Sequence, residues 1–416
     1  GANYGWTQAP PAYSTLGNTI QNSRELTLNT QFNFVSLYNK IPLLRRINQG
    51  TKKAKAGGPA ADDKGSAATE KNKKEKQAFG TGFLRALMMV RNANVNYTLR
   101  DGIVLPGFVH QIDYFGQNFA HSVPGIPFIL GSQNEDIRYN LAQMGALTND
   151  VRVNNFYSQN HIKTIQGSAT LEPMKDFRIQ MNFNLSRSNT LQTLFRYDTT
   201  GEYKNIAGQW RDLSLRETGN FTMTGIFIQT ANDKASAKNN WESTNYQNFE
   251  NFRFVVSQRQ ANEDGRVALK GIDKTNGGKY YYGYGAKAQN TLIPAFFAAY
   301  TGTNQSKVSL SPFRSLPLPN WNINYNGLSK IKALGKIFTN ITLQHRYSGT
   351  YNIGGYTSNL YYNPNDTARG GKDLVSQYNI NNVNIREQFS PLIGIDVTTK
   401  SGITGGFKIN RSRNVS

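Results

Sequence analysis

The sequence predicts an all-β fold class: a segment of a large antiparallel transmembrane β-barrel with inserted loops and short helices, to which the whole of residues 1–416 belongs. Three observations lead to this prediction. Several segments alternate apolar and polar residues over about nine positions, the length that one tilted strand needs to cross a bilayer. Tight turns alternate with long connections along the chain. The longest apolar run, near residues 293–300, is far shorter than the roughly 18 residues of a membrane helix.

The clearest alternating segment is a predicted β-hairpin at residues 165–185. Its first arm alternates up to Leu171, and its second arm alternates without a fault from Phe177. Such strands have one apolar face, which we expect to contact lipid. A soluble β-sandwich strand alternates in the same way, so the other strands must decide between the two. The residues expected to face lipid are Phe177, Ile179, Met181, Phe183 and Leu185, with Phe407 and Ile409 of the last hairpin.

Further strands follow the same pattern. The strand that ends near residue 99 raises a difficulty, because its backward extension places Arg91 among apolar positions. An arginine near the bilayer midplane costs about 2–4 kcal/mol. We therefore predict a β-bulge at Arg91, which returns Met88 and Val90 to the apolar side. The other expected strands cover residues 26–34, 221–227, 321–325 and 341–347, and a last hairpin pairs residues 393–397 with 403–409.

Three segments break the strand pattern. Residues 51–77 form a Lys, Ala, Gly and Glu tract with too little apolar surface to fold, and we expect a disordered charged linker there. Residues 101–160 contain Pro-Gly corners between aromatic clusters, which predicts an inserted loop folded into or over the barrel. Residues 240–300 are expected to form an insertion with short helices, because apolar residues at 249–259 and 293–297 have helical spacing.

The composition argues against several function classes. The net charge of +21 suggests nucleic acid as a partner, but the basic residues are scattered and do not interleave with aromatic residues in one motif. No cysteine is present, and four histidines lack metal-ligand spacing. No nucleophile elbow or phosphate loop occurs. We therefore expect no enzymatic activity, no cofactor, no metal and no nucleic-acid partner.

Counting crossings predicts which connections share an end of the barrel. The tight turns near residues 173–176 and 399–402 should lie at the same end as two similar helix-like segments, 38–47 and 326–337. In bacterial barrels the tight turns are periplasmic. We therefore expect residues 51–77 and the helix at 249–259 on the periplasmic side, and residues 101–160 on the outer or lumenal side. Because the chain begins at Gly1 without a signal-peptide pattern, we expect a portion of a longer protein.

One set of motifs resembles a known family. Residues 105–108 read Leu-Pro-Gly-Phe, residues 116–118 read Gly-Gln-Asn, and residues 124–133 read Pro-Gly-Ile-Pro-Phe-Ile-Leu-Gly-Ser-Gln. Together with stretches such as residues 319–329 and 387–394, they resemble the outer-membrane translocon of the type IX secretion system, the SprA or Sov family of gliding-motility and cell-surface proteins. The signature loop residues are Pro106, Gly107, Phe108, Gly116, Pro124, Gly125, Phe128 and Gly131.

The resemblance implies a very large single-chain barrel in the bacterial outer membrane. It implies a protein-conducting pore that exports folded cargo proteins and is needed for gliding in gliding species. Implied partners are membrane lipid, secreted cargo, a periplasmic plug protein and a porin-like cargo-accepting partner. The alternative that the residues leave open is a large porin or nutrient transporter, in which residues 101–160 could serve as a constriction loop.

Overall fold

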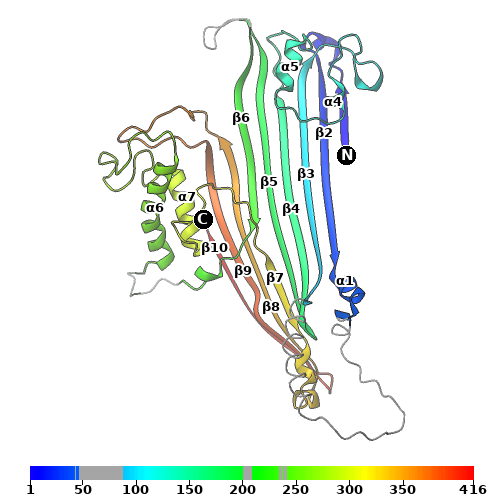
Figure 1. Cartoon of the computed structure of the whole chain (residues 1–416), viewed down its shortest axis with the longest axis vertical. Helices are drawn as coiled ribbons and strands as arrows, with labels where there is room; N and C mark the ends of the chain where they lie inside the picture. The colour runs from blue at the N-terminus through cyan, green and yellow to red at the C-terminus, as the bar shows by residue number, and fades with distance from the viewer. Residues whose placement is uncertain (43, 46–87, 200–208, 234–236, 238–240) are drawn as a thin grey trace, which may run out of the picture.

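A computed structural model describes residues 1–42, 44–45, 88–199, 209–233, 237 and 241–416. Its strands form one antiparallel sheet in which most strands are far longer than a bilayer crossing requires. Figure 1 shows the strands running along the long axis of the molecule. The strands are β1 (Ala2–Thr7), β2 (Asn18–Asn33), β3 (Val90–Phe108), β4 (Tyr157–Met174), β5 (Phe177–Asp198), β6 (Gln209–Thr224), β7 (Asn320–Tyr325), β8 (Phe338–Ser358), β9 (Tyr378–Thr399) and β10 (Thr404–Val415).

The strands pair mostly in chain order, from β1 at one edge of the sheet to β10 at the other. The exception lies between β5 and β8, where two separate strands occupy the place of one. β6 pairs with Leu185–Asp198 of β5, β7 pairs with Phe177–Asn182 of β5, and both β6 and β7 pair with β8. The backbone N–H of Leu318 donates to the carbonyl of Thr224 at 3.1 Å, so the chain leaves and rejoins the sheet at one place. Residues 225–319 are therefore an insertion within a strand.

The predicted hairpins and the predicted bulge are confirmed. Ile165 pairs with Leu185 and Leu171 with Ile179, while Phe407 pairs with Ile395 in the last hairpin. The register between β3 and β4 shifts at Arg91, between Val90 and Asn92. The Arg91 Nε lies 2.9 Å from a carboxylate oxygen of Glu172, so the bulge gives the guanidinium an acidic partner. A residue outside the regular ladder can turn away from the face that its strand would assign to it.

The tight turns lie at one end of the sheet, as the crossing count predicts. At that end the backbone N–H of Asn326 donates to the carbonyl of Asp176 at 3.0 Å, and Lys330 pairs with the Asp176 carboxylate. The backbone N–H of Lys400 donates to the carbonyl of Ile337 at 2.9 Å. The helical turns α1 (Phe34–Lys40), η5 (Gly327–Lys330) and η6 (Leu334–Lys336) lie there too. We call this the tight-turn end and the opposite one the long-loop end.

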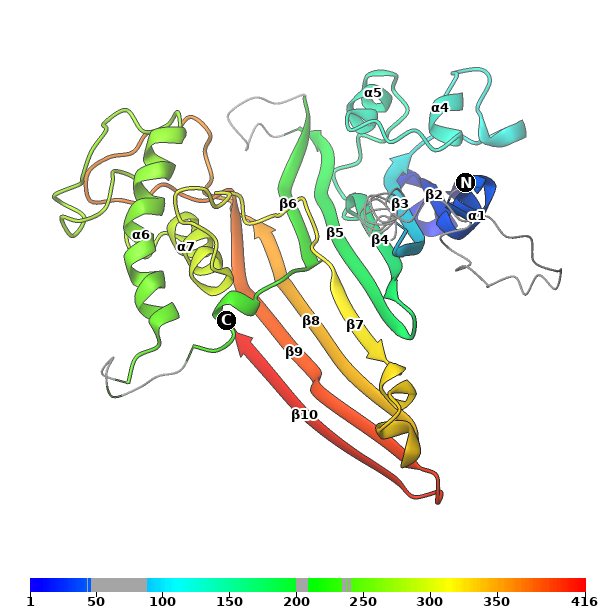
Figure 2. The same ribbon diagram turned by 60° about the horizontal axis from the view of Figure 1, so that its bottom comes forward.

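Two bodies outside the sheet cover part of one of its faces (Figure 2). The first cover is residues 109–156 with α4 (Ile126–Ile129) and α5 (Ile137–Gln143), and it packs on β2 to β5. The second cover comprises the described residues of 225–319, with α6 (Thr244–Glu263) and α7 (Gln289–Thr301), together with residues 359–377. The second cover packs on β5, β6, β8 and β9. Among the described residues, no helix combines the length and the apolar character that crossing a membrane requires.

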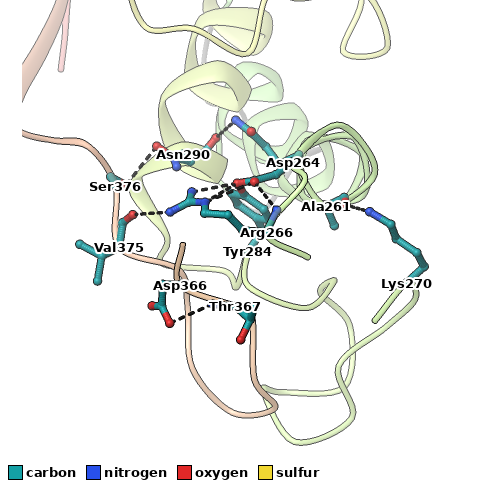
Figure 3. A network of polar contacts seen from close by, with 11 residues as sticks. Ala261, Asp264, Arg266, Lys270, Tyr284, Asn290, Asp366, Thr367, Val375 and Ser376 are labelled. Carbon is teal, nitrogen blue, oxygen red and sulfur yellow. Dashed lines mark hydrogen bonds and ion pairs between the residues drawn. The ribbon is translucent and has the colours of Figure 1, made fainter. Parts of the chain in front are cut away.

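A polar network joins the parts of the second cover (Figure 3). Arg266 makes an ion pair of 2.8 Å with Asp264, whose carboxylate also accepts a hydrogen bond from the Tyr284 hydroxyl. The Arg266 backbone carbonyl accepts from the Ala368 N–H at 3.1 Å. Burial opposes ionisation of Asp264, but the hydrogen bonds from Arg266 and Tyr284 outweigh it and lower the pKa of this carboxyl to about 2. The network therefore fastens the β8–β9 connection to the C-terminal end of α6.

The structure corrects several predicted boundaries, and the strand expected at residues 221–227 is the end of a longer strand that stops at Thr224. The loop expected at residues 101–160 is shorter, because β3 continues to Phe108 and β4 begins at Tyr157. The helix expected at residues 249–259 is part of a longer one, and strand 26–34 ends at Asn33, where α1 begins with the Asn33 side chain accepting from the Ser36 N–H. The predicted linker at residues 51–77 lies outside the described residues.

The predicted position of the 249–259 helix is wrong. α7 packs with α6, and its Gln289 side chain exchanges hydrogen bonds with Tyr378 and Ile380 at the start of β9. The start of β9 is its end away from the Lys400 turn, so this helix pair lies toward the long-loop end. The prediction failed because the strand expected at residues 221–227 does not complete a crossing: residues 225–319 interrupt the crossing, and β7 completes it.

Candidate functional site: a polar row beside an apolar row

One line of Ser, Thr and Asn side chains crosses eight strands of the sheet. From Thr27 to Asn384 each member lies directly opposite the next on the neighbouring strand, whereas Asn414, whose register partner is Arg386, is a diagonal neighbour of Asn384 on the same face of the sheet. At its far end the Asn384 side-chain amide donates to the Asn414 side-chain oxygen at 2.6 Å. This polar row consists of Thr27, Thr98, Thr164, Ser186, Thr222, Asn352, Asn384 and Asn414.

The polar row continues into a broad polar surface toward the tight-turn end. The next two rows on β2 to β5 carry mainly amide side chains, and their residues are among those that line an open depression. Charged side chains share this face as well, among them Arg178, Arg346 and Arg386, and Lys408 lies 3.3 Å from its neighbour Asp396. The two amide rows are Asn29, Asn96, Gln166 and Asn184, then Gln31, Asn94, Ser168 and Asn182.

The neighbouring row of the same eight strands is wholly apolar. Its side chains point to the opposite face, because successive residues of a strand alternate between faces. This apolar row consists of Leu28, Tyr97, Ile165, Leu185, Met223, Tyr351, Ile385 and Val415. These two adjacent rows thus separate polar from apolar side chains completely across eight strands.

The apolar face is bare at the tight-turn end and covered at the long-loop end. Phe407 is 60% exposed, and Ile409 is also exposed. Phe177, Ile179, Met181 and Phe183, at the same end on β5, are half-buried. These six predicted lipid-facing residues lie on the bare part of the face, where lipid could reach them.

Leu185 corrects the predicted set, because it is only 5% exposed and belongs to the core under the second cover. Its neighbours there include Phe221, Met223 and Tyr351. The alternating pattern assigns Leu185 to the right face, but this position already lies beneath protein. The second cover, which lies far from Leu185 in the sequence, buries this position.

The signature loop residues gather where the first cover meets β1 and β2. Pro106, Gly107 and Phe108 end β3 rather than opening a loop, and Gly107 has a φ of +88° at a register shift. Gly107 lies so close to Gly17 that a Cβ added to Gly17 would come within 2.6 Å of the Gly107 carbonyl carbon. Both positions therefore require glycine.

The remaining signature residues surround Tyr4 of β1. The ring of Phe128 packs edge-on against the Tyr4 ring with centroids 6.2 Å apart, and a Cβ on Gly116 would collide with the same ring. A Cβ added to Gly131 would come within 3.0 Å of the Ala2 Cβ. Pro124 and Gly125 form the corner before α4. The Asn22 side chain holds this corner by donating to the carbonyls of Phe128 and Ser132 at 2.8 and 2.9 Å.

The signature loop is thus a structural fastening of β1 and β2 rather than a chemical site. Within the part of the chain that the structure describes, no three His, Asp or Glu side chains gather closely enough to hold a metal ion. No protein-family profile matches the chain, and a search of curated proteins found no significant match.

Sequence reasoning found the two faces but missed the rows. Alternation within a strand shows which residues share a face, whereas a row across strands depends on the register between them. The signal that could have found it is the repeated pair of a polar residue beside an apolar one, such as Thr27 before Leu28 or Asn384 before Ile385. Only the register aligns these pairs.

Proposed function

We propose that this chain forms part of the wall of a protein-conducting pore in the bacterial outer membrane, the translocon of the type IX secretion system that its motifs resemble. The observation that carries the proposal is the polar row beside the apolar row. In a membrane barrel, lipid-facing and lumen-facing residues alternate in this manner. In this proposal the bare part of the apolar face contacts lipid and the polar row faces the lumen.

The chemistry of the polar row suits a pore that passes folded proteins. Hydroxyl and amide side chains keep a surface hydrated, because they exchange hydrogen bonds with water. Since they carry no net charge, they attract neither acidic nor basic cargo strongly. A lumen lined by many charges of one sign would hold oppositely charged proteins and exclude the others.

The length of the strands supports a membrane position for the bare half only. β5 has 22 residues, whereas a tilted strand crosses the hydrocarbon in about 9–11 residues. The remaining half must project beyond the bilayer, where no lipid could shield its apolar face. The two covers shield that half. With the tight turns in the periplasm, as is usual in bacterial barrels, the covers lie on the outer side of the membrane.

The position of the first cover favours a protein pore over a porin or nutrient transporter. A constriction loop would have to lie across the polar face, where solutes pass. The first cover instead packs on the apolar face, through Ile20, Ile103 and Leu105. In the described residues, neither cover lies over the polar row.

Single cysteines can test the assignment of the two faces, because the chain has no native cysteine. We would introduce Asn184→Cys on the polar face and Phe183→Cys beside it on the apolar face, in the full-length protein in its own membrane. A secreted cargo protein fused to a bulky domain that stalls export would be present in both strains. A water-soluble bifunctional reagent should link the cargo to the Asn184→Cys protein but not to the Phe183→Cys protein.

Two outcomes would reject the proposal. Cross-linking of cargo to Phe183→Cys but not to Asn184→Cys would reverse the two faces. Normal export in cells that lack the protein, together with lost uptake of a sugar or siderophore, would make it a nutrient transporter.

A further inference from the structure

A small apolar cavity lies where the second cover rejoins the sheet, next to β7. Its volume is about 260 Å³. It lies on the apolar face, since Met223 and Phe227 of its lining belong to the core between the second cover and the sheet. Its mouth is flanked by Leu316 and Leu318, which are 73% and 42% exposed. The other aromatic residues that line it are Phe297 and Phe313.

One cation, Arg314, lines this apolar cavity. Its guanidinium carbon lies 3.8 Å above the centre of the Phe297 ring, a cation–π contact, and its Nη1 donates to the carbonyl of Ser309 at 2.8 Å. Its Nε and Nη2 are both buried, and among the described residues neither has a hydrogen-bond acceptor. Burial lowers the pKa of Arg314 from its usual value. Other arginines of the second cover, such as Arg266, have a carboxylate partner.

The two unpartnered nitrogens form the edge of the guanidinium that binds oxyanions. Nε and Nη2 carry parallel N–H bonds that match the two oxygens of a carboxylate or a phosphate. Burying a charged group without such a partner is costly, so a bound oxyanion would relieve a defect that the fold otherwise carries. The surroundings also restrict what accompanies the oxyanion, because aromatic rings and leucines favour an apolar chain.

We infer that the Arg314 cavity binds the oxyanion head of an acyl lipid, with the acyl chain leaving past Leu316 and Leu318 along the bare apolar face. The exposed leucines at the mouth and the bare apolar face of β7 beyond it argue for a lipid rather than a protein segment. The inference does not depend on protein conduction. It needs only that this face meets lipid or detergent.

Equilibrium dialysis of the purified full-length protein in non-ionic detergent tests the inference. The probes are radiolabelled dodecanoate, dodecyl phosphate and inorganic phosphate. We expect saturable binding of an acyl probe at one site, and no binding of inorganic phosphate, which lacks the apolar chain. The relative affinities of dodecanoate and dodecyl phosphate identify the head group as a carboxylate or a phosphate.

Three variants separate binding from folding. Arg314→Gln removes the charge and should weaken binding about tenfold or more, since charge-assisted pairs are the strong ones. Arg314→Lys keeps the charge but loses the two-pronged geometry, so its affinity should be intermediate. Leu316→Glu places a negative charge at the exposed mouth and should weaken binding by repulsion. Arg196→Gln is the control, because Arg196 donates to the Val151 carbonyl in the first cover.

The inference is overturned if the native protein shows no saturable binding of either acyl probe. It is also overturned if Arg314→Gln, with an unchanged unfolding midpoint, binds as tightly as the native protein. Tighter binding of an acidic amphipathic peptide than of both acyl probes would replace the lipid with a protein partner. None of these outcomes bears on which face lines the pore, because all are measured in detergent and without cargo.

Discussion

The two halves of the apolar face share one sequence pattern but differ in what covers them. On the bare half, Leu28 is 63% exposed and Phe407 60%, whereas on the covered half Phe221 is 1% exposed and Tyr351 fully buried. Leu28 and Tyr351 even belong to the same apolar row. An alternating pattern therefore specifies that a face is apolar, and it does not specify whether lipid or protein will cover it.

The two covers reach this face in different ways. The first cover connects the ends of β3 and β4 and folds back over them, as long loops commonly do. The second interrupts a crossing halfway, between Thr224 and Asn320. Arg413 of β10 fastens its beginning, with Nη1 donating to the Thr230 carbonyl at 2.6 Å and Nη2 lying 3.1 Å from the Glu387 carboxylate. The second cover thus begins at the level where the bare half ends.

The largest difference in unfolding free energy between the two halves is expected from a substitution that leaves a cavity. Phe221→Ala should cost about 3–5 kcal/mol of unfolding free energy, because the core beneath the second cover cannot refill the space. Phe407→Ala loses transfer free energy without leaving a cavity, so its cost should stay below about 2 kcal/mol. Denaturant unfolding in detergent micelles measures both. Protease cleavage within residues 225–319 should rise only for Phe221→Ala, and equal losses would refute the division into halves.

A charged substitution distinguishes lipid from water as the neighbour of the bare half. Met181→Arg should cost about 2–4 kcal/mol in vesicles, since its side chain would enter hydrocarbon. Asn182→Arg, one residue along on the polar face, should change stability by no more than about 0.5 kcal/mol. Folding into lipid vesicles over a urea series measures the two costs. A Met181→Arg protein as stable as Asn182→Arg would show that water, not lipid, covers the bare half.

The sequence predicts the features that depend on residues within one strand, and it does not predict those that depend on distant segments. The hairpin at residues 165–185 and the bulge at Arg91 depend on neighbours along one strand, and both predictions are confirmed. The burial of Leu185 and the position of α6 depend on an insertion that departs from the middle of a crossing. The sequence of β6 and β7 carries no turn signal strong enough to reveal that they share one crossing. The polar row depends on the register of eight strands, which no single segment encodes.

The hydrogen-bond network at Asp264 stabilises one part of the covered half, the connection at residues 359–377. Asp264→Asn leaves Arg266 and Tyr284 without their shared acceptor and should cost about 1–3 kcal/mol, felt locally at residues 359–377. In the folded protein the pKa of Asp264 is about 2, below the ordinary value of about 3.9. The stabilisation is therefore complete above about pH 4 and is lost as the pH falls toward 2. Hydrogen exchange should accelerate in residues 359–377 over that range and leave β2 to β4 unchanged.

Between pH 4 and 2, hydrogen-exchange protection of residues 359–377 should fall less in Asp264→Asn than in the native protein. An equal fall in both proteins would assign the pH effect to other carboxylates. Arg253, which pairs with Glu250 on α6, provides the control. Glu250→Gln removes an exposed pair worth only a few tenths of a kcal/mol. It should leave exchange in this connection as it is in the native protein.

The smallest effect on unfolding free energy is expected from substitutions on the polar face. Asn384→Ala removes the hydrogen bond to Asn414, and a cross-strand polar pair contributes about 0.2–1 kcal/mol. Because water can replace the lost partner on an exposed face, the unfolding free energy should fall within that range. Asn384→Leu should change the unfolding free energy in detergent equally little. If the polar row lines a protein-conducting pore, as proposed, the added apolar side chain should bind passing cargo proteins and slow their export. If Asn384→Leu instead stabilised the protein in vesicles by the transfer free energy of a leucine side chain, the polar row would face lipid.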